Sequence, residues 1–590
     1  MDPGPLITET VLFPVAAYSS NYEAVGVASQ AIAWGDSTLN PVNRVDSLDI
    51  SAKSRWDIDG AEADGKLYWV TPKFARGRPP RRIDLYVRSA ETSPPNLTGL
   101  LGFHKIPLVS SATRGRFGVG RHIIKALDHW SSRIADFERA YMSAPFGSQI
   151  TVDQIKRDVQ SMRITLIPNY DLEKQWLSTQ DLQRVWGLSR KSMPESIDID
   201  QLQFKRRLHY SVCIVEVMGQ PALGDVIFKS HVVDSNDMYR ELQNLLQLPA
   251  HPNLQRKPVY LVTKRVRFGG KHGVCGYIAA FYPTGSLDQV MRRPGCNLSQ
   301  LTRLRCAKDV VRGLIAIRDS PLKYFADLKL DNLAVESNTA SDSGELKDAR
   351  RLVIIDFEQG TPWMEWAPPE VYWVNQIERL VTGNVEQRVQ SEHLELLSLL
   401  VPDWTPKDRR LGCNLASHSP AWSHLSDNEK SSAVVYMAGK VIWCLMEGAA
   451  EMAEPVTLAS FLADRSTPVF PNFRNTPTGL RECIRQCTSG APEWESRQQP
   501  FHVRGGKVIL RSTTELEGPH AASQVMTAAQ EWWKEELESA KRFVQLRVHG
   551  AKTLEDRGFL EFMGMRPTME EVLQAIEDAE LSSQNSAGME

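Results

Sequence analysis

The spacing of hydrophobic residues changes twice along the chain and predicts three structurally different parts. In the first 195 residues, short runs of β-branched and aromatic residues alternate with clusters of Pro, Gly, Ser and Asn, a pattern typical of a strand-rich region. Apolar side chains from Ile123 to Tyr141 recur every three or four residues, which predicts an amphipathic helix over residues 121–142. The expected strands of this part cover residues 10–17, 66–70, 83–87, 97–104 and 164–167.

The second part has the pattern of a small antiparallel sheet with one covering helix, at residues 237–248. After residue 283 the pattern becomes mainly helical, with two further strands at 333–336 and 352–355. The expected strands of the second part cover residues 202–208, 212–217, 225–230, 259–263 and 277–281. The expected helices of the third part cover residues 298–317, 392–400, 434–448, 480–487, 527–544 and 566–573.

Composition limits the class of protein. A chain of 590 residues is long enough for about three domain-sized portions. Its 42% hydrophobic and 24% charged residues are typical of a globular protein, and its net charge of -2 argues against a general nucleic-acid-binding surface. The eight cysteines form no C-x-x-C pair, and no histidine cluster accompanies Cys483 and Cys487, which favours reduced thiols over a metal site.

The start of the chain has no basic segment before an apolar run, so the sequence predicts no signal peptide. Residues 434–448 are the most apolar helical segment, but they are too few and carry Lys440 and Glu447, which favours a buried core helix over a membrane anchor. We therefore expect an intracellular protein of the cytoplasm, with the nucleus as the alternative, that binds neither nucleic acid nor membranes. The sequence leaves its oligomeric state open.

Two features of the first part have both a plain and a functional interpretation. Glycines 115, 118 and 120 precede the predicted helix and could bind a phosphate through free N–H groups, but no Lys-Ser or Lys-Thr pair follows them, which favours a flexible turn. The basic residues between Lys73 and Arg82 could contact nucleic acid or act as an import signal, but two prolines interrupt them, which favours a solvated loop. The function of this part stays unknown.

Residues 324–332, Y-F-A-D-L-K-L-D-N, place an acid, a cation and an amide within six residues. Asp327 can orient a hydroxyl, Lys329 can neutralise a phosphate, and Asn332 can bind a metal ion, which together is the chemistry of phosphoryl transfer. A charged turn after a helix is the plain alternative for this stretch taken alone.

A lysine on a predicted strand supplies a second group of this kind. Lys229 ends the run V-I-F-K among apolar neighbours, and Glu241 follows twelve residues later on the helix at 237–248. A lysine on a strand and a glutamate on the covering helix can form an ion pair that aims the ammonium at phosphate oxygens. The apolar run at 352–355 is followed directly by Asp356.

In this order the segments resemble those of protein kinases, and in particular the divergent kinase-like proteins of filamentous fungi. The resemblance covers residues 201–575, and it implies that Arg566 pairs with Glu370. The motifs that carry it are V-I-F-K at 226–229, the helix of Glu241, H-P-N at 251–253, G-S-L at 285–287, F-A-D-L-K-L-D-N at 325–332, D-F-E at 356–358, A-P-P-E at 367–370 and R-P-T-M-E-E-V-L at 566–573.

The resemblance implies a nucleotide site in the second part. Lys229 then contacts the α and β phosphates of ATP, and Glu241 holds the lysine in place. Ala280 and Tyr282 lie on the hinge whose backbone meets the adenine, with Ala279 near the gatekeeper position.

The resemblance also implies roles at the catalytic stretch. Asp327 matches the acid that accepts the proton of the substrate hydroxyl, and Lys329 matches the cation near the transferred phosphate. Asn332 and Asp356 match the ligands of Mg²⁺. ATP and Mg²⁺ are therefore the expected nucleotide and metal, and a protein Ser/Thr hydroxyl is the expected substrate.

The chain departs from the kinase pattern at four places. Residues 208–211 read L-H-Y-S where a glycine-rich turn is usual, so backbone N–H groups approach phosphates less closely. Ala326 replaces the arginine that binds a phosphorylated activation loop, and Glu358 replaces a glycine whose backbone can flip. Val434 replaces the aspartate that usually supports the catalytic loop from beneath.

The expected fold class is α+β, a two-lobed kinase-like fold behind an extra N-terminal strand-rich region. Its boundaries are 1–195 for the N-terminal region, 201–282 for the small lobe, and 283–578 for the helical lobe with insertions near 376–430 and 489–563. A disordered tail is expected at 581–590. The expected function is ATP-dependent phosphate transfer. A pseudokinase scaffold or nucleotide-binding module without turnover is the alternative, and the fifteen residues from Asp356 to Glu370 leave a small-molecule kinase as a third.

Overall fold

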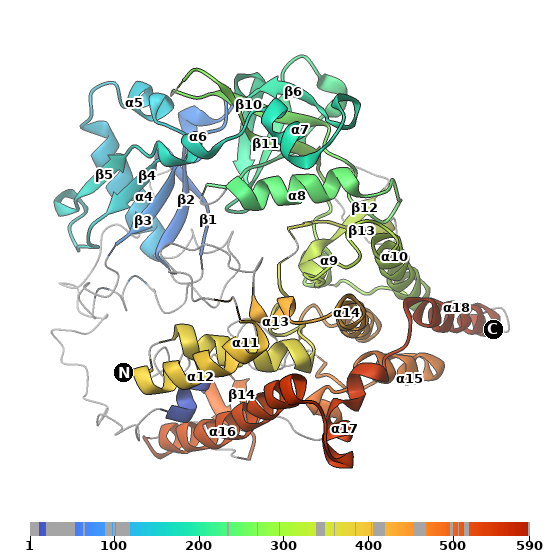
Figure 1. Cartoon of the computed structure of the whole chain (residues 1–590). Helices are drawn as coiled ribbons and strands as arrows, with labels where there is room; N and C mark the ends of the chain where they lie inside the picture. The colour runs from blue at the N-terminus through green and yellow to red at the C-terminus, as the bar shows by residue number, and fades with distance from the viewer. Residues whose placement is uncertain are drawn as a thin grey trace.

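Figure 1 shows the computed structural model of the chain, a mixed α/β protein with several sheets. The two largest sheets lie in the upper half of the view, and most helices that follow residue 283 lie in the lower half. The structure describes residues 11–18, 53–62, 65–88, 97, 101, 118–232, 235–267, 269–293, 295–337, 349–358, 360–383, 385–402, 404, 419–452, 468–495, 499–504, 507–512 and 519–587.

The first sheet has five strands in the order β1-β2-β3-β4-β5. Strands β3 and β4 run parallel, which requires a long crossover connection, and two helices, α4 (Gly118–Ser132) and α5 (Phe137–Ser143), lie between them in the chain. The other neighbouring strands are antiparallel. Ile123 and Leu127 of α4 are fully buried in the same core as the sheet. The strands are β1 (Trp56–Ala61), β2 (Leu67–Pro72), β3 (Asp84–Val87), β4 (Gln149–Val152) and β5 (Ile164–Ile167).

The strands expected at 66–70, 83–87 and 164–167 are confirmed. Two other expectations for this region are wrong, and a third lies mostly outside the described residues. Residues 11–17 are not a strand: Pro14–Tyr18 form the 3-10 helix η1, and the carbonyl of Val11, three residues before it, accepts a hydrogen bond from Trp533. The helix expected at 121–142 is two helices, because Asp136 adopts a left-handed backbone with φ of 53°. Of residues 97–104 and of glycine 115, only Leu97 and Leu101 lie within the described residues, and both are helical.

The second sheet has six strands in the order β6-β10-β11-β9-β8-β7. Helix α8 (Ser235–Gln247) covers it, and Tyr239 on that helix donates a 2.9 Å hydrogen bond to the carbonyl of Val274 on β11. The expected antiparallel sheet is confirmed, and β6 extends it as a parallel edge strand that begins before residue 201. The strands are β6 (Glu195–Asp198), β7 (Leu202–Arg207), β8 (Val212–Val217), β9 (Val226–Lys229), β10 (Tyr260–Arg265) and β11 (His272–Ala280).

Backbone hydrogen bonds join the two sheets. The amide of Gly77 donates to the carbonyl of Phe204 on β7 at 2.7 Å, and the amide of Phe204 donates to the carbonyl of Arg78 at 2.9 Å. The Arg82 side chain is fully buried, and its Nη1 donates to the backbone carbonyl of Ser230 at 3.2 Å. The segment at 77–78 therefore covers the outer edge of β7, which would otherwise present unpaired backbone groups.

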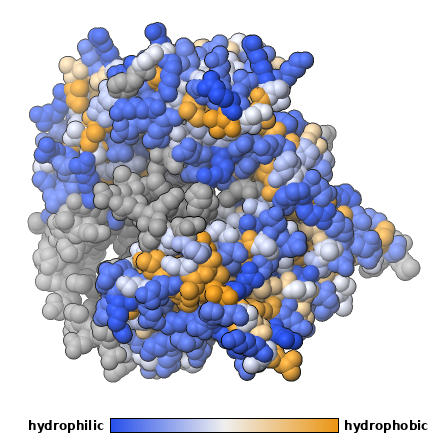
Figure 2. All heavy atoms as spheres, viewed as in Figure 1, coloured by the Kyte–Doolittle hydropathy of each residue, from blue (hydrophilic) through white to orange (hydrophobic). Residues whose placement is uncertain are grey.

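The third part is mainly helical, and its described residues include two antiparallel strand pairs. One pair is β12 (Leu333–Ser337) and β13 (Ala349–Ile354), and the other is β14 (Phe501–Arg504) and β15 (Lys507–Leu510). Hydrophobic side chains gather around α11 and α13, whereas hydrophilic side chains dominate the outer faces of the two sheets (Figure 2). The larger helices are α10 (Gln300–Arg318), α11 (Pro369–Thr382), α12 (Gln387–Leu400), α13 (Pro420–Ser423), α14 (Asp427–Glu447), α15 (Thr478–Cys487), α16 (Pro519–His549), α17 (Leu554–Glu561) and α18 (Met569–Ala587).

Helix α14 has clear start and stop signals and a buried apolar centre, which explains why it forms where the sequence predicts a helix. Ser426 and Glu429 form a capping box at its start, Gly448 ends it with φ of 74°, and every residue from Ala433 to Glu447 is buried. None of the helices in the described ranges is both long enough and apolar enough to cross a membrane.

The expected disordered tail is wrong up to residue 587, because α18 continues to Ala587. Ion pairs with α10 hold this helix, among them Arg312 with Glu577 at 2.9 Å and Lys308 with Glu580. Residues 588–590 lie outside the described residues.

Candidate functional site

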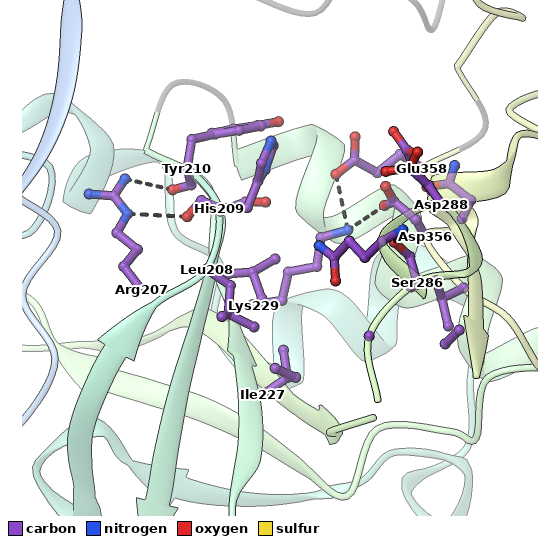
Figure 3. Close-up of a pocket in the computed structure, with 18 of the residues that line it drawn as sticks. Arg207, Leu208, His209, Tyr210, Ile227, Lys229, Ser286, Asp288, Asp356 and Glu358 are labelled. Carbon is purple, nitrogen blue, oxygen red and sulfur yellow. Dashed lines mark hydrogen bonds and ion pairs between the residues drawn. The ribbon is translucent and has the colours of Figure 1, made fainter. Parts of the chain in front are cut away.

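A cavity of about 1660 Å³ lies between the second sheet, the helical part and one edge of the first sheet. Figure 3 shows its wall at the β7–β8 turn, the end of β9 and residues 356–358. The eight residues singled out from the sequence all line this cavity: Lys229, Glu241, Ala280, Tyr282, Asp327, Lys329, Asn332 and Asp356.

The expected ion pair between β9 and α8 is confirmed. The Nζ atom of Lys229 lies 2.8 Å from the carboxylate of Glu241, and the two side chains are 9% and 1% exposed. Burial raises the pKa of Glu241 to about 7, against the attraction of Lys229. Burial opposes the charge on Lys229, but its carboxylate neighbours prevail and hold its pKa well above the ordinary value.

Lys229 contacts two more carboxylates. Its Nζ lies 2.5 Å from Oδ1 of Asp356 and 3.1 Å from Oε1 of Glu358 (Figure 3). Glu358 also lies 3.0 Å from Nε2 of His231. Although burial acts in the opposite direction, Lys229 and His231 lower the pKa of the Glu358 carboxyl far below its usual range. Glu358 is therefore a charged partner of the lysine, in addition to replacing a flexible glycine.

His231, Glu241 and Glu358 place ligand atoms within 4.8 Å of one another, a spacing that one metal ion could bridge. The ammonium of Lys229 already lies within 3.1 Å of both carboxylates. The cation of this cluster is therefore the lysine itself.

Residues 324–332 form a compact network between α10 and β12. The side-chain amide of Asn332 donates to the backbone carbonyl of Asp327 at 2.8 Å and to its Oδ2 at 2.9 Å. Nζ of Lys329 lies 3.1 Å from the same Oδ2 and 4.5 Å from the ring centroid of Trp363. The other carboxylate oxygen, Oδ1, is buried and has no hydrogen-bond partner among the described residues.

Burial raises the pKa of Asp327 to about 6, although the Lys329 ammonium acts in the opposite direction. A buried carboxylate with one free oxygen and a pKa near neutrality is suited to accept a proton. Asn332 and Lys329 fix the second oxygen, so the free oxygen has a defined direction.

The segment that carries Asp356 is fixed against α8. Asp356 adopts φ of 68°, which is uncommon outside glycine. The Phe357 amide donates to Oε1 of Glu241 at 3.2 Å, and the Asn244 side chain donates to the Phe357 carbonyl at 2.8 Å. The ring of Phe357 lies 5.1 Å from that of Phe325, beside Asp327. These contacts bring Asp327 and Asp356 into one cavity.

The turn between β7 and β8 is held by an arginine in place of a glycine-rich backbone. Arg207 donates from Nε to the His209 carbonyl at 3.2 Å and from Nη2 to the Tyr210 carbonyl at 2.8 Å (Figure 3). Its Nη1 pairs with Asp84 on β3 of the first sheet, and both side chains are 4% exposed. The His209 ring packs at 5.4 Å on Trp69 of β2. The first sheet therefore positions the turn.

Ala280 ends β11, and Tyr282 follows it at the cavity wall. Burial raises the pKa of Tyr282 to about 12, so its hydroxyl stays protonated. Contact of these residues with an adenine stays a prediction.

The expected pairing of Arg566 with Glu370 is confirmed. Two parallel hydrogen bonds of 2.5 and 2.9 Å join the side chains, and both are fully buried. This pair ties the start of α11 to the segment before α18, below the cavity.

Sequence reasoning missed three residues at the site: His231, Arg207 and Trp363. His231 lies two residues after Lys229, just beyond the end of β9, so its closeness in the sequence was the one signal for it. Arg207 pairs with a residue 123 positions away in another sheet, and no local pattern reveals such a contact.

A scan against protein-family models gives no match, and a search of curated proteins also gives none. The interpretation of this site therefore depends on its geometry and on the motifs themselves.

Proposed function

We propose that the chain is an ATP- and Mg²⁺-dependent phosphotransferase of the protein-kinase type, with residues 201–282 as its small lobe and 283–578 as its helical lobe. The observation that supports this proposal best is the arrangement at Asp327. Its Oδ2 is held by Asn332 and Lys329, its Oδ1 is free, and the Lys229–Glu241 ion pair lines the same cavity.

The donor set fits ATP and Mg²⁺. Asn332 uses its amide nitrogen within the protein, which leaves its amide oxygen as a ligand, and Asp356 adds carboxylate oxygens, the atom type that Mg²⁺ prefers. Lys229 is a fixed cation for phosphate oxygens. A bound Mg²⁺ would supply neutralisation of the charge on the phosphates.

The residues of the chain then have distinct tasks. The substrate hydroxyl oxygen bonds to the γ-phosphorus as the bond from that phosphorus to the β–γ bridging oxygen breaks, and the hydroxyl proton passes to Oδ1 of Asp327. Lys329 stabilises negative charge that develops on the transferred phosphoryl group. Asn332 keeps the Asp327 carboxylate in one orientation. We propose a protein Ser/Thr hydroxyl as the substrate.

A pseudokinase that binds nucleotide without turnover is the second candidate. The observation that favours it is the ion cluster at Lys229, whose ammonium contacts Glu241, Asp356 and Glu358 together. A phosphate group must displace at least one of these carboxylates before it reaches the lysine.

The test measures ATP binding and phosphate transfer separately. Thermal unfolding of the full chain is recorded with ATP and Mg²⁺, and transfer is followed with γ-labelled ATP onto the chain itself and onto generic Ser/Thr-rich proteins. Wild type is compared with Asp327→Asn and with Asp319→Asn, whose carboxylate is 62% exposed. The expected result is that all three bind ATP and that only Asp327→Asn loses transfer, by about 10²–10⁴-fold.

Binding without transfer by wild type would favour the pseudokinase. Transfer that survives in Asp327→Asn would remove Asp327 from its proposed role. Failure of every form to bind ATP would contradict both candidates.

A further inference from the structure

A second cavity, of about 330 Å³, lies within the helical part. Its walls come from α11, α14, α16 and α17 and from two 3-10 helices, η16 (Pro492–Glu495) and η17 (Phe562–Gly564). Among the described residues that line the two cavities, only Met364 lines both. This volume is at the small end of the range for ligand pockets.

Aromatic side chains form much of the lining. Trp373 stacks on Phe559 with ring centroids 5.2 Å apart and an interplanar angle of 14°, and Phe562 meets Trp373 edge-on at 6.1 Å. These contacts fix the rings before any ligand enters. The aromatic residues of the wall are Tyr372, Trp373, Tyr436, Trp532, Phe559 and Phe562.

The same wall carries three carboxylates, from Glu493, Glu536 and Glu561, and one lysine, Lys440. Glu493 is 8% exposed, and its Oε2 is buried without a hydrogen-bond partner among the described residues. Burying a charged oxygen is costly unless a cation or a donor compensates it. The Glu493 carboxylate therefore points to a positively charged occupant.

Lys440, on the same wall, attracts that carboxylate but directs its ammonium elsewhere. Its Nζ donates to the backbone carbonyl of Glu365 at 2.8 Å and lies 5.1 Å from the ring centroid of Tyr436. Within the described part of the chain it forms no ion pair with Glu493. Burial lowers the pKa of Lys440, although the attraction of Glu493 acts in the opposite direction.

We propose that this cavity binds a small quaternary ammonium ligand, with its charge against Glu493 and its methyl groups against the aromatic wall. Aromatic rings attract a cation through their electron-rich faces, and Trp and Tyr do so best. A quaternary ammonium carries no N–H groups, so it needs none of the several acceptors that a primary amine requires. Trp532 keeps a buried Nε1–H without a partner among the described residues, a donor for a ligand hydroxyl.

The test uses choline and its neutral carbon analogue 3,3-dimethylbutan-1-ol, which has the same shape without the charge. Binding of each to the full chain is measured by isothermal titration calorimetry. The expected result is that choline binds at least tenfold more tightly than the neutral alcohol. Glu493→Gln, which keeps the shape of the side chain, should weaken choline binding at least tenfold.

A matched control and a second variant make the test decisive. Glu538→Gln removes a carboxylate that is 75% exposed on the same helix as Glu536, and should change choline affinity less than twofold. If Glu493→Gln does not fold, Trp532→Leu, which replaces a half-buried ring, should weaken choline at least fivefold. Thermal shift by ATP should be the same in all folded variants, so the result does not depend on the proposed phosphotransferase.

Three outcomes would overturn the proposal. These are no binding of choline at millimolar concentration, equal binding of choline and the neutral alcohol, and choline binding that survives both Glu493→Gln and Trp532→Leu. Each would leave the space as a hydrated packing defect only.

Discussion

Two lysines face the same cavity from opposite halves, and their surroundings differ. Lys329 pairs with one carboxylate and lies over the Trp363 ring, and its partner Asp327 keeps one oxygen free. Lys229 is surrounded by three carboxylates, one of which, Glu358, also lies 3.0 Å from Nε2 of His231. In the proposed phosphotransferase, the Asp327 side of the cavity is therefore open to a substrate hydroxyl, whereas the Lys229 side must rearrange before its ammonium can reach a phosphate.

This difference shows that a residue can match a motif and still be unavailable to a ligand, because its charge is already paired within the protein. Asp356 and Glu358 both belong to the D-F-E motif, and both hold the lysine that a nucleotide phosphate would need. Mg²⁺ bound by Asp356 would remove one of these contacts, but the contact with Glu358 would persist.

The largest expected effects come from replacing the two lysines. Lys229→Met leaves Glu241 buried without its cation and should lower the free energy of unfolding by about 3–5 kcal/mol. Lys329→Met leaves Asp327 with its Asn332 hydrogen bond, so it should keep most of its stability and slow transfer by about 10²–10³-fold. Chemical denaturation and transfer assays on both variants check this. Equal destabilisation by the two changes would contradict the proposed difference.

A second large effect is expected at the turn between β7 and β8. Arg207→Met leaves Asp84 buried without its partner and should lower the free energy of unfolding by about 3–5 kcal/mol. The double variant Arg207→Met, Asp84→Leu removes both charges and should recover most of that loss. A double-mutant cycle by denaturant unfolding measures the coupling. A coupling energy near zero would show that the first sheet does not hold the turn through this pair.

The pH dependence of phosphate transfer should follow the ionisation of Asp327. Asp327 accepts a proton only when ionised, and because its pKa is raised to about 6, the protonated form persists to higher pH than for an ordinary aspartate. At saturating ATP the transfer rate should fall about tenfold between pH 7 and pH 5. ATP binding is measured over the same range by thermal shift, because Glu241, with a pKa of about 7, titrates nearby. A rate that stays constant down to pH 5 would contradict the role of Asp327.

The smallest expected effect tests the third carboxylate at Lys229. Glu358→Gln removes one competitor for the ammonium and should raise ATP affinity about two- to fivefold, since a partly exposed ion pair contributes up to about 1 kcal/mol. Glu429→Gln is the matched control, because Glu429 is 22% exposed and pairs with Arg547 far along the chain. Weaker ATP binding by Glu358→Gln would show that this carboxylate supports the site.

Much of the local structure could be predicted from the sequence because it follows local periodicity. The second sheet, α10 and α14 have clear repeats, and the Lys229–Glu241 pair links one strand to the helix that follows it. The strand prediction for residues 10–17 is wrong over the described residues 11–17, because a short apolar run fits several structures, and Val11 contacts Trp533, which lies 522 residues away. The sequence also does not reveal the break between α4 and α5 at Asp136, because the helical spacing of apolar residues continues across it.

The contacts between the first sheet and β7 have a consequence for dividing the chain. A protein shortened to begin near residue 195 would lose the backbone partners of Phe204 and the carboxylate that neutralises Arg207. It would present β7 as an open edge strand, which invites pairing with another copy. Residues of the first 195 therefore cover the edge of the second sheet, so aggregation of such a fragment would carry no information on whether the intact protein transfers phosphate.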